Sequence, residues 1–231
     1  MKTENGRKFA IKDIVLTALA AALLSAGKQA LASIPNVEVV TLFIMLYAAC
    51  FKPQIAFLAT QIYIFIEIFI WGINTWVFAY LIHWNLLALF TFFLARVFKV
   101  KNRFVYLGYT IVMTALFGVL TSAIDALVGW GKTGLSFFTL FSAIYVRGIY
   151  FYIVHVVGNA AINLTLFAPM RDLLTKLMIK YYGVSPLDKK PKISPEPSED
   201  EKDVLRERSE GDAPKEGAEE GDEGPLASAR K

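Results

Sequence analysis

Residues 76–95 read WVFAYLIHWNLLALFTFFLA, twenty consecutive residues without Asp, Glu, Lys or Arg. A run of this length and composition is long enough for a helix to cross the hydrocarbon core of a bilayer. Comparable apolar runs lie on both sides of it. We predict six membrane-spanning helices, at about residues 14–34, 37–51, 54–71, 76–95, 104–128 and 143–168. The sequence therefore predicts an all-α, polytopic membrane protein.

For two of these predicted segments, the second and the sixth, the sequence leaves the placement in the membrane open. The second is short and is bounded by Pro35-Asn36 and Lys52-Pro53, which are poor helix-interior sequences. We expect it to lie obliquely or to begin in the headgroup region. Before the sixth segment, the aromatic residues Phe137, Phe138 and Phe141 either lie in the membrane interface or extend that helix.

The charges divide the chain into two unlike parts. Residues 184–231 hold 14 of the 20 acidic and 9 of the 24 basic residues, so the formal charge of +4 separates into −5 there and +9 on residues 1–183. So few charged residues cannot cover a soluble domain of 183 residues, which excludes a soluble enzyme. Residues 184–231 are rich in Pro, Glu, Ser and Gly, and we expect a disordered, charged cytoplasmic tail without a specific partner.

The basic residues of the body predict its orientation, because cytoplasmic loops are enriched in Lys and Arg. With the N-terminus inside, the cytoplasmic set comprises Lys2, Arg7, Lys8, Lys12, Lys52, Arg96, Lys99, Lys101, Arg103, Arg171, Lys176 and Lys180. Only Lys28, Lys132 and Arg147 fall elsewhere. We therefore predict an N-in/C-in, multi-pass protein of a prokaryotic plasma membrane, whose basic charge reflects topology and implies no nucleic-acid partner.

Polar residues at membrane depth gather in the outward half of the predicted bundle. They are Lys28, Asn36, Glu38, Glu67, Asn74, Trp76, Tyr80, His83, Trp84, Asp125, Arg147, Tyr150, His155 and Asn159. Charged groups inside a bilayer normally face a cavity or one another. Taken singly, Glu38 and Glu67 also fit as interfacial residues and Trp76 as an aromatic-belt anchor. The one-sided distribution predicts an outward-facing polar cavity with aromatic walls, suited to an aromatic or heterocyclic small molecule.

The first predicted helix also carries small residues at regular spacing. Ala18, Ala22, Ala26 and Ala30 recur every four residues and therefore share one helix face. Small faces let another helix backbone approach closely in lipid. This face either packs within the protein's own bundle or docks to a separate membrane subunit.

Several kinds of chemistry have no support in the sequence. One cysteine, Cys50, and two histidines give no basis for a metal site, and we expect no cofactor. The glycine-rich stretch 129–134 lacks the P-loop spacing. No paired-carboxylate or Ser/His/Asp arrangement has a spacing typical of a catalytic site, so we expect a protein that is not an enzyme.

Several short motifs together resemble one family of membrane proteins. They are LASIPNVE at 31–38, INTW at 73–76, HVVGN at 155–159 and FAPM at 167–170, with the alanine-stepped first helix and the six-span topology. Over about residues 10–178 the chain resembles the substrate-binding S component of energy-coupling factor (ECF) vitamin transporters. The acidic tail departs from the family's compact pattern.

The resemblance implies a subunit that captures a vitamin or related micronutrient from outside. It implies a docking face at Ala18, Ala22 and Ala26 for a transmembrane coupling subunit, and two cytoplasmic ATPase subunits that drive the cycle. The outward polar residues would then form the substrate site of a six-helix transmembrane substrate-capture domain, residues 1–183. Two other function classes stay open: a self-contained small secondary transporter or channel-like protein, and a small membrane enzyme or assembly factor.

Overall fold

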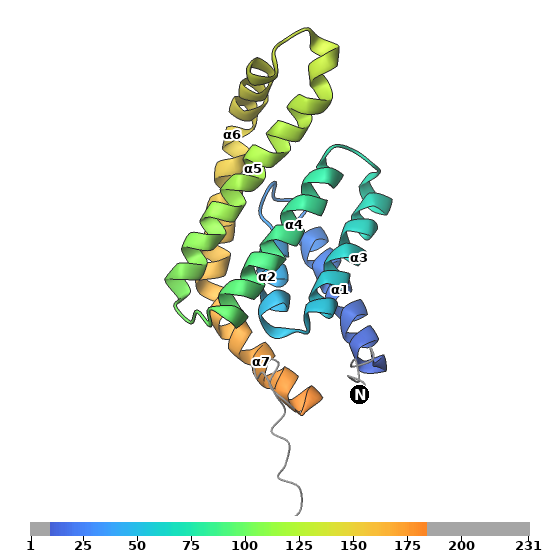
Figure 1. Ribbon diagram of the computed structural model, residues 1–231, viewed down its shortest axis with the longest axis vertical. Helices are drawn as coiled ribbons and strands as arrows, with labels where there is room; N and C mark the ends of the chain where they lie inside the picture. Colours follow the sequence, from blue (N-terminus) through green and yellow to red (C-terminus); the bar gives the residue numbers. More distant parts are fainter. Residues whose placement is uncertain (1–9, 184–231) are drawn as a thin grey trace, which may run out of the picture. The chain divides into compact units, whose positions relative to one another are not determined.

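The computed structural model describes residues 10–183, and within this range the chain is helical, without strands (Figure 1). The helices are α1 (Ile11–Ala30), α2 (Val40–Cys50), α3 (Pro53–Trp71), α4 (Trp76–Phe92), α5 (Arg103–Thr133), α6 (Phe137–Ile162) and α7 (Ala168–Tyr182). Two π-helical stretches, η1 (Phe93–Val97) and η2 (Asn163–Phe167), continue α4 and α6. The predicted tail at 184–231 lies outside the described residues.

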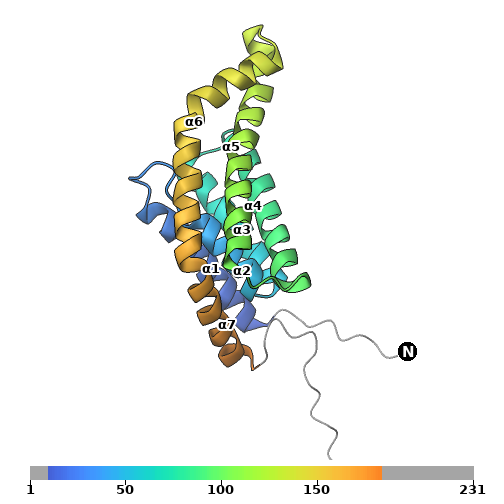
Figure 2. The same cartoon turned by 90° about the vertical axis from the view of Figure 1, so that its left-hand side faces the viewer.

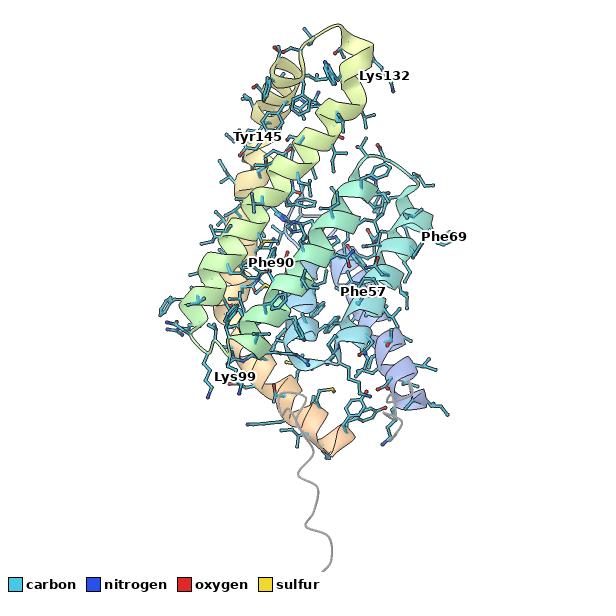
Figure 3. The ribbon with its side chains drawn as sticks, in the orientation of Figure 1. Phe57, Phe69, Phe90, Lys99, Lys132 and Tyr145 are labelled. Carbon is cyan, nitrogen blue, oxygen red and sulfur yellow. The ribbon has the colours of Figure 1, made fainter. Side chains whose placement is uncertain are left out.

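Four helical stretches are long and apolar enough to cross a membrane. They are Pro53–Trp71, Trp76–Val97, Arg103–Thr133 and Phe137–Tyr182, and they correspond to the third to sixth predicted segments. Their surfaces are apolar as well, since Phe57 is 52% exposed and Phe69 is 88% exposed and points away from the bundle (Figure 3). Exposed apolar side chains on this scale are typical of a protein embedded in lipid rather than of a soluble monomer.

The short helix α2 forms the centre of the bundle. Every residue from Val40 to Cys50 is buried except Phe43, and α1, α3, α4 and α7 all pack against it. A helix that is apolar on all sides is stable when protein surrounds it. The eleven residues of α2 are fewer than a lipid-facing span needs, and protein rather than lipid covers them.

The last predicted segment is longer in the structure than in the sequence analysis. We predicted residues 143–168, but α6 begins at Phe137, so the aromatic stretch extends the helix. At its other end the helix continues through η2 into α7 and ends at Tyr182. Pro169 lacks an N–H, and its ring would collide with the carbonyl four residues earlier. The wider π-helical turn at 163–167 lies where this conflict arises, and the chain stays helical through it.

Close packing joins α5 and α6, which run side by side (Figure 2). A Cβ atom on Gly118 of α5 would come within 2.7 Å of the Tyr152 ring of α6, so a side chain there would displace that ring. The Tyr152 hydroxyl reaches across to Ser122, with 2.8 Å between the two oxygens. This contact fixes the two longest helices against each other.

The lower end of the bundle in Figure 1, where α1 begins and α7 ends, carries an ionic clamp. The Lys52 ammonium donates to both carboxylate oxygens of Asp13, at 2.7 and 2.8 Å. The Tyr182 hydroxyl and the Ala10 backbone N–H donate to the same carboxylate, at 2.7 and 3.0 Å. Asp13 precedes the apolar run that starts at Ile14, so the clamp ties α1, the α2–α3 turn and α7 together outside the predicted span.

We predict that Asp13→Asn lowers the free energy of unfolding by about 1–3 kcal/mol, because hydrogen bonds to a charged group are lost. Burial raises the pKa of the Asp13 carboxyl, but Lys52, Ala10 and Tyr182 outweigh it and hold that pKa below its ordinary value. The stabilisation is therefore fully present above the ordinary pKa of 3.8 and is lost as the pH falls through the lowered pKa.

Denaturation of the detergent-solubilised protein at pH 7 and at lower pH measures both effects. The matched control is Asp172→Asn, because Asp172 is 64% exposed in its ion pair and should change stability by less than about 1 kcal/mol. Equal destabilisation by the two substitutions would contradict the clamp.

Candidate functional site

The upper end of the bundle, where α1 and α3 end and α4 begins, contains a buried ion pair. The ammonium of Lys28, in the last turn of α1, pairs with the carboxylate of Glu67 on α3. The same ammonium donates to the Tyr80 hydroxyl at 3.0 Å, and the Gln29 amide donates to Glu67 at 3.4 Å. Glu67 is completely buried, so Lys28 and Gln29 compensate a charge that would otherwise be very unfavourable there.

Aromatic rings surround the Lys28 ammonium. Its nitrogen lies 4.9 Å from the centre of the Tyr80 ring and 6.0 Å from those of Tyr63 and Trp76. Cations are attracted to ring faces at these distances. Trp76, Tyr80 and Trp84 are spaced by four residues on α4, which brings their rings to one helix face.

A second part of the site joins α6 to the loop between α1 and α2. The His155 Nε2 atom lies 3.8 Å from a carboxylate oxygen of Glu38. One turn further along α6, the Asn159 amide donates to the His155 carbonyl at 3.0 Å. Both His155 and Asn159 are buried, although α6 is otherwise largely exposed.

Phe117 of α5 connects the two parts. Its ring centre lies 4.9 Å from that of His83, 5.3 Å from that of His155 and 6.0 Å from that of Tyr80. It also stacks on Trp84. Side chains from α1, α3, α4, α5, α6 and the loop before α2 thus form one cluster, buried at its centre and partly exposed at Gln29 and Lys28, which we call the polar–aromatic cluster. Its members are Lys28, Gln29, Glu38, Tyr63, Glu67, Trp76, Tyr80, His83, Trp84, Phe117, His155 and Asn159.

Several buried polar atoms of this cluster lack a hydrogen-bond partner among the described residues. They are Glu38 Oε1, Tyr63 Oη, His83 Nε2, Trp84 Nε1, His155 Nε2 and Asn159 Oδ1. A buried polar atom without a partner is costly, and native proteins satisfy nearly all such atoms. Three of these atoms belong to side chains that contact the Phe117 ring, namely His83, Trp84 and His155, and the whole set provides both donors and acceptors for a bound polar molecule.

The structure brings together nine of the residues that the sequence predicted as a substrate site: Lys28, Glu38, Glu67, Trp76, Tyr80, His83, Trp84, His155 and Asn159. The outward-facing cavity itself stays a prediction. Gln29, Tyr63 and Phe117 were not among the predicted site residues. Tyr63 precedes Glu67 by four residues and so shares its helix face, which was a usable signal; Phe117 is one apolar residue among many.

The other five predicted residues lie apart from the cluster. Asn36 and Asn74 are exposed in loops, and the side-chain Oδ1 of Asn74 accepts from the Thr75 backbone N–H at 2.7 Å. Arg147 and Tyr150 are exposed on α6, and Asp125 is half-buried on α5. Within residues 10–183, no hydrogen bond or ion pair joins these five to the cluster.

The alanine face of α1 is exposed. Ala18, Ala22 and Ala26 face outward, whereas Ala21 and Leu24 are buried against the bundle. Of the two alternatives left by the sequence, packing of this face within the protein's own bundle is therefore wrong. The exposed alanines leave a smooth helix surface that another helix could approach closely.

We predict that Lys28→Met lowers the free energy of unfolding by about 3 kcal/mol, because the buried Glu67 carboxylate loses its counter-charge. Neutralising both partners in Lys28→Met/Glu67→Gln should restore part of the loss, giving a coupling energy of at least about 1 kcal/mol in a double-mutant cycle. Lys132→Met, an exposed lysine at the same end, is the matched control. Additive effects of the two single substitutions would show that the pair contributes nothing specific.

Comparisons with known proteins give no relative for this chain: no family model, no curated protein and no solved structure matches it. The resemblance to ECF S components therefore stays a prediction that rests on the residues themselves.

Proposed function

We propose that the protein is the substrate-binding S component of an ECF-type importer and captures a vitamin or related micronutrient from outside the cell. The observation that carries the proposal is the polar–aromatic cluster at the upper end, with its unpartnered buried polar atoms. A site of apolar and aromatic walls with a few converging polar groups is the usual form of a small-molecule site.

The proposal places the lower end of the bundle in the cytoplasm, with six crossings and both termini inside. The charges of the described residues support this orientation, because Lys and Arg concentrate on cytoplasmic loops. The lower end carries Lys12, Lys52, Arg96, Lys99, Lys101, Arg103, Arg171, Lys176 and Lys180, and the upper end carries Lys28, Lys132 and Arg147. Figure 3 shows Lys99 and Lys132 at these opposite ends. The exposed apolar side chains Val15, Leu19 and Leu23 on α1 support its place in the membrane.

The unpartnered atoms define the ligand's chemistry. The Trp84 indole N–H can only donate a hydrogen bond. An ionised Glu38 carboxylate and the side-chain Oδ1 of Asn159 accept hydrogen bonds, and the Tyr63 hydroxyl can donate and accept. The rings of Trp84 and Phe117 provide faces on which a flat molecule can stack. We expect an aromatic or heterocyclic ligand that carries both hydrogen-bond donors and acceptors.

Native mass spectrometry of the protein purified gently from its own membrane tests the capture of a ligand. We expect one small molecule per chain, and Trp84→Phe should weaken its retention about tenfold because one buried N–H donor is lost. The matched control is Trp130→Phe, because Trp130 lies outside the cluster and is 51% exposed. If both variants retained the small molecule equally well, the polar–aromatic cluster would not be its binding site.

The alanine face of α1 predicts dependence on a partner. Ala22→Trp should abolish co-purification with a coupling subunit and two ATPases while ligand retention survives, because a bulky side chain blocks close helix approach. Ala115→Trp, which places the same side chain on an exposed alanine of α5, should leave the complex intact. A complex that survives Ala22→Trp would show that the docking face is elsewhere.

ATP-independent uptake by the purified protein in liposomes would contradict the proposal in another way. That result would favour a self-contained secondary transporter.

A further inference from the structure

A cavity of about 590 Å³ lies at the lower end of the bundle, far along the helices from the polar–aromatic cluster. The segment from Ala95 to Lys101, the beginning of α5 and the first half of α7 line it. Five of its lining side chains are basic, namely Arg96, Lys99, Lys101, Arg171 and Lys176, and one, Asp172, is acidic. The proposed capture of a substrate uses none of these residues.

Local contacts hold the two arginines in place. The Arg96 guanidinium donates to the backbone carbonyls of Ala48, at 3.2 Å, and of Phe51, and so satisfies carbonyls at the end of α2. The Arg171 guanidinium donates to Asp172 at 3.2 and 3.3 Å and lies 6.0 Å from the centre of the Tyr106 ring. Two oriented guanidinium groups therefore form one wall of the cavity.

The three lysines are not neutralised in the same way. Lys99, Lys101 and Lys176 are exposed, and within residues 10–183 no ion pair involves any of them. The rest of the lining includes apolar side chains, among them Ala49 and Val100. The cavity therefore combines an excess of positive charge at its rim with an apolar floor.

We propose that this cavity binds a phosphate group, and that the headgroup of an anionic phospholipid supplies it. Arginine and lysine donors recognise phosphate through charge-assisted hydrogen bonds. The cavity lies where the apolar helices end, which is the depth of lipid headgroups, and basic pockets between helices at this depth fit anionic headgroups. The apolar floor matches the first acyl carbons of a lipid, for which a free phosphate has no counterpart.

The chain's own acidic residues are the competing occupant. Residues 184–231 carry 14 acidic residues, including the run Glu199-Asp200-Glu201, and follow α7 directly. Carboxylates would satisfy the positive rim but not the apolar floor, which is why we favour the lipid.

Native mass spectrometry of the full-length protein in mild detergent, titrated with phosphatidylglycerol and phosphatidylcholine of equal chain length, measures the binding. We expect phosphatidylglycerol to bind more tightly than phosphatidylcholine. Lys176→Gln should weaken the affinity for phosphatidylglycerol about fivefold, which is the contribution of about one surface charge to the binding of an anionic lipid. The triple variant Lys99→Gln/Lys101→Gln/Lys176→Gln should lose more. Lys180→Gln, on the same helix but outside the cavity lining, should bind as the unchanged protein does.

A parallel titration with inorganic phosphate distinguishes the two sources of the group. Phosphatidylglycerol binding much more tightly than inorganic phosphate assigns the site to lipid, and equal binding with the same dependence on Lys176 assigns it to a free phosphate. The proposal is overturned if the triple variant binds phosphatidylglycerol unchanged. It is also overturned if binding appears only in Glu199→Gln/Asp200→Asn/Glu201→Gln, because the tail would then occupy the cavity.

Discussion

The cost of holding the Glu67 carboxylate inside an apolar bundle constrains the upper half of this protein. The carboxylate is completely buried, and among residues 10–183 only the Lys28 ammonium and the Gln29 amide form hydrogen bonds to it. For them to meet, the end of α1 must lie against α3, and Tyr80 of α4 lies close enough to accept the second side-chain hydrogen bond of Lys28. One buried charge thus determines how three helices converge, and the aromatic rings of the site pack around that point.

The same principle explains why the remaining polar atoms indicate function. Glu38, His83 and His155 are buried like Glu67, but their unpartnered atoms receive no comparable compensation from the described residues. A bundle selected only for stability would replace them with apolar side chains, since unsatisfied buried groups cost more than they contribute. A ligand that supplies the missing partners gives these residues a reason to be there. Under the proposed function, the exposed alanine face of α1 would contact the partner subunit and the basic lower end would contact the membrane.

The sequence predicted much of this arrangement where run length or helical spacing carries the information. Long apolar runs identified the four helical stretches that are long and apolar enough to cross a membrane, and the position of polar residues in the outward half of the predicted bundle identified nine members of the polar–aromatic cluster. Helical phase also explains why Tyr150 lies apart from the cluster. At about 100° per residue, Tyr150 is turned by roughly 140° from His155 around α6, so both cannot face the cluster.

Other features depend on tertiary packing and have no local signal. Nothing in the sequence of α2 distinguishes a short central helix from a short span, because both are apolar throughout.

The central claim is that the polar–aromatic cluster holds the captured ligand, and an experimental structure of the protein purified gently from its own membrane tests it most directly. The account predicts a bound molecule in hydrogen-bond contact with Trp84 Nε1 and His155 Nε2. A structure in which a bound molecule lies elsewhere, while ordered water satisfies these atoms, would contradict it.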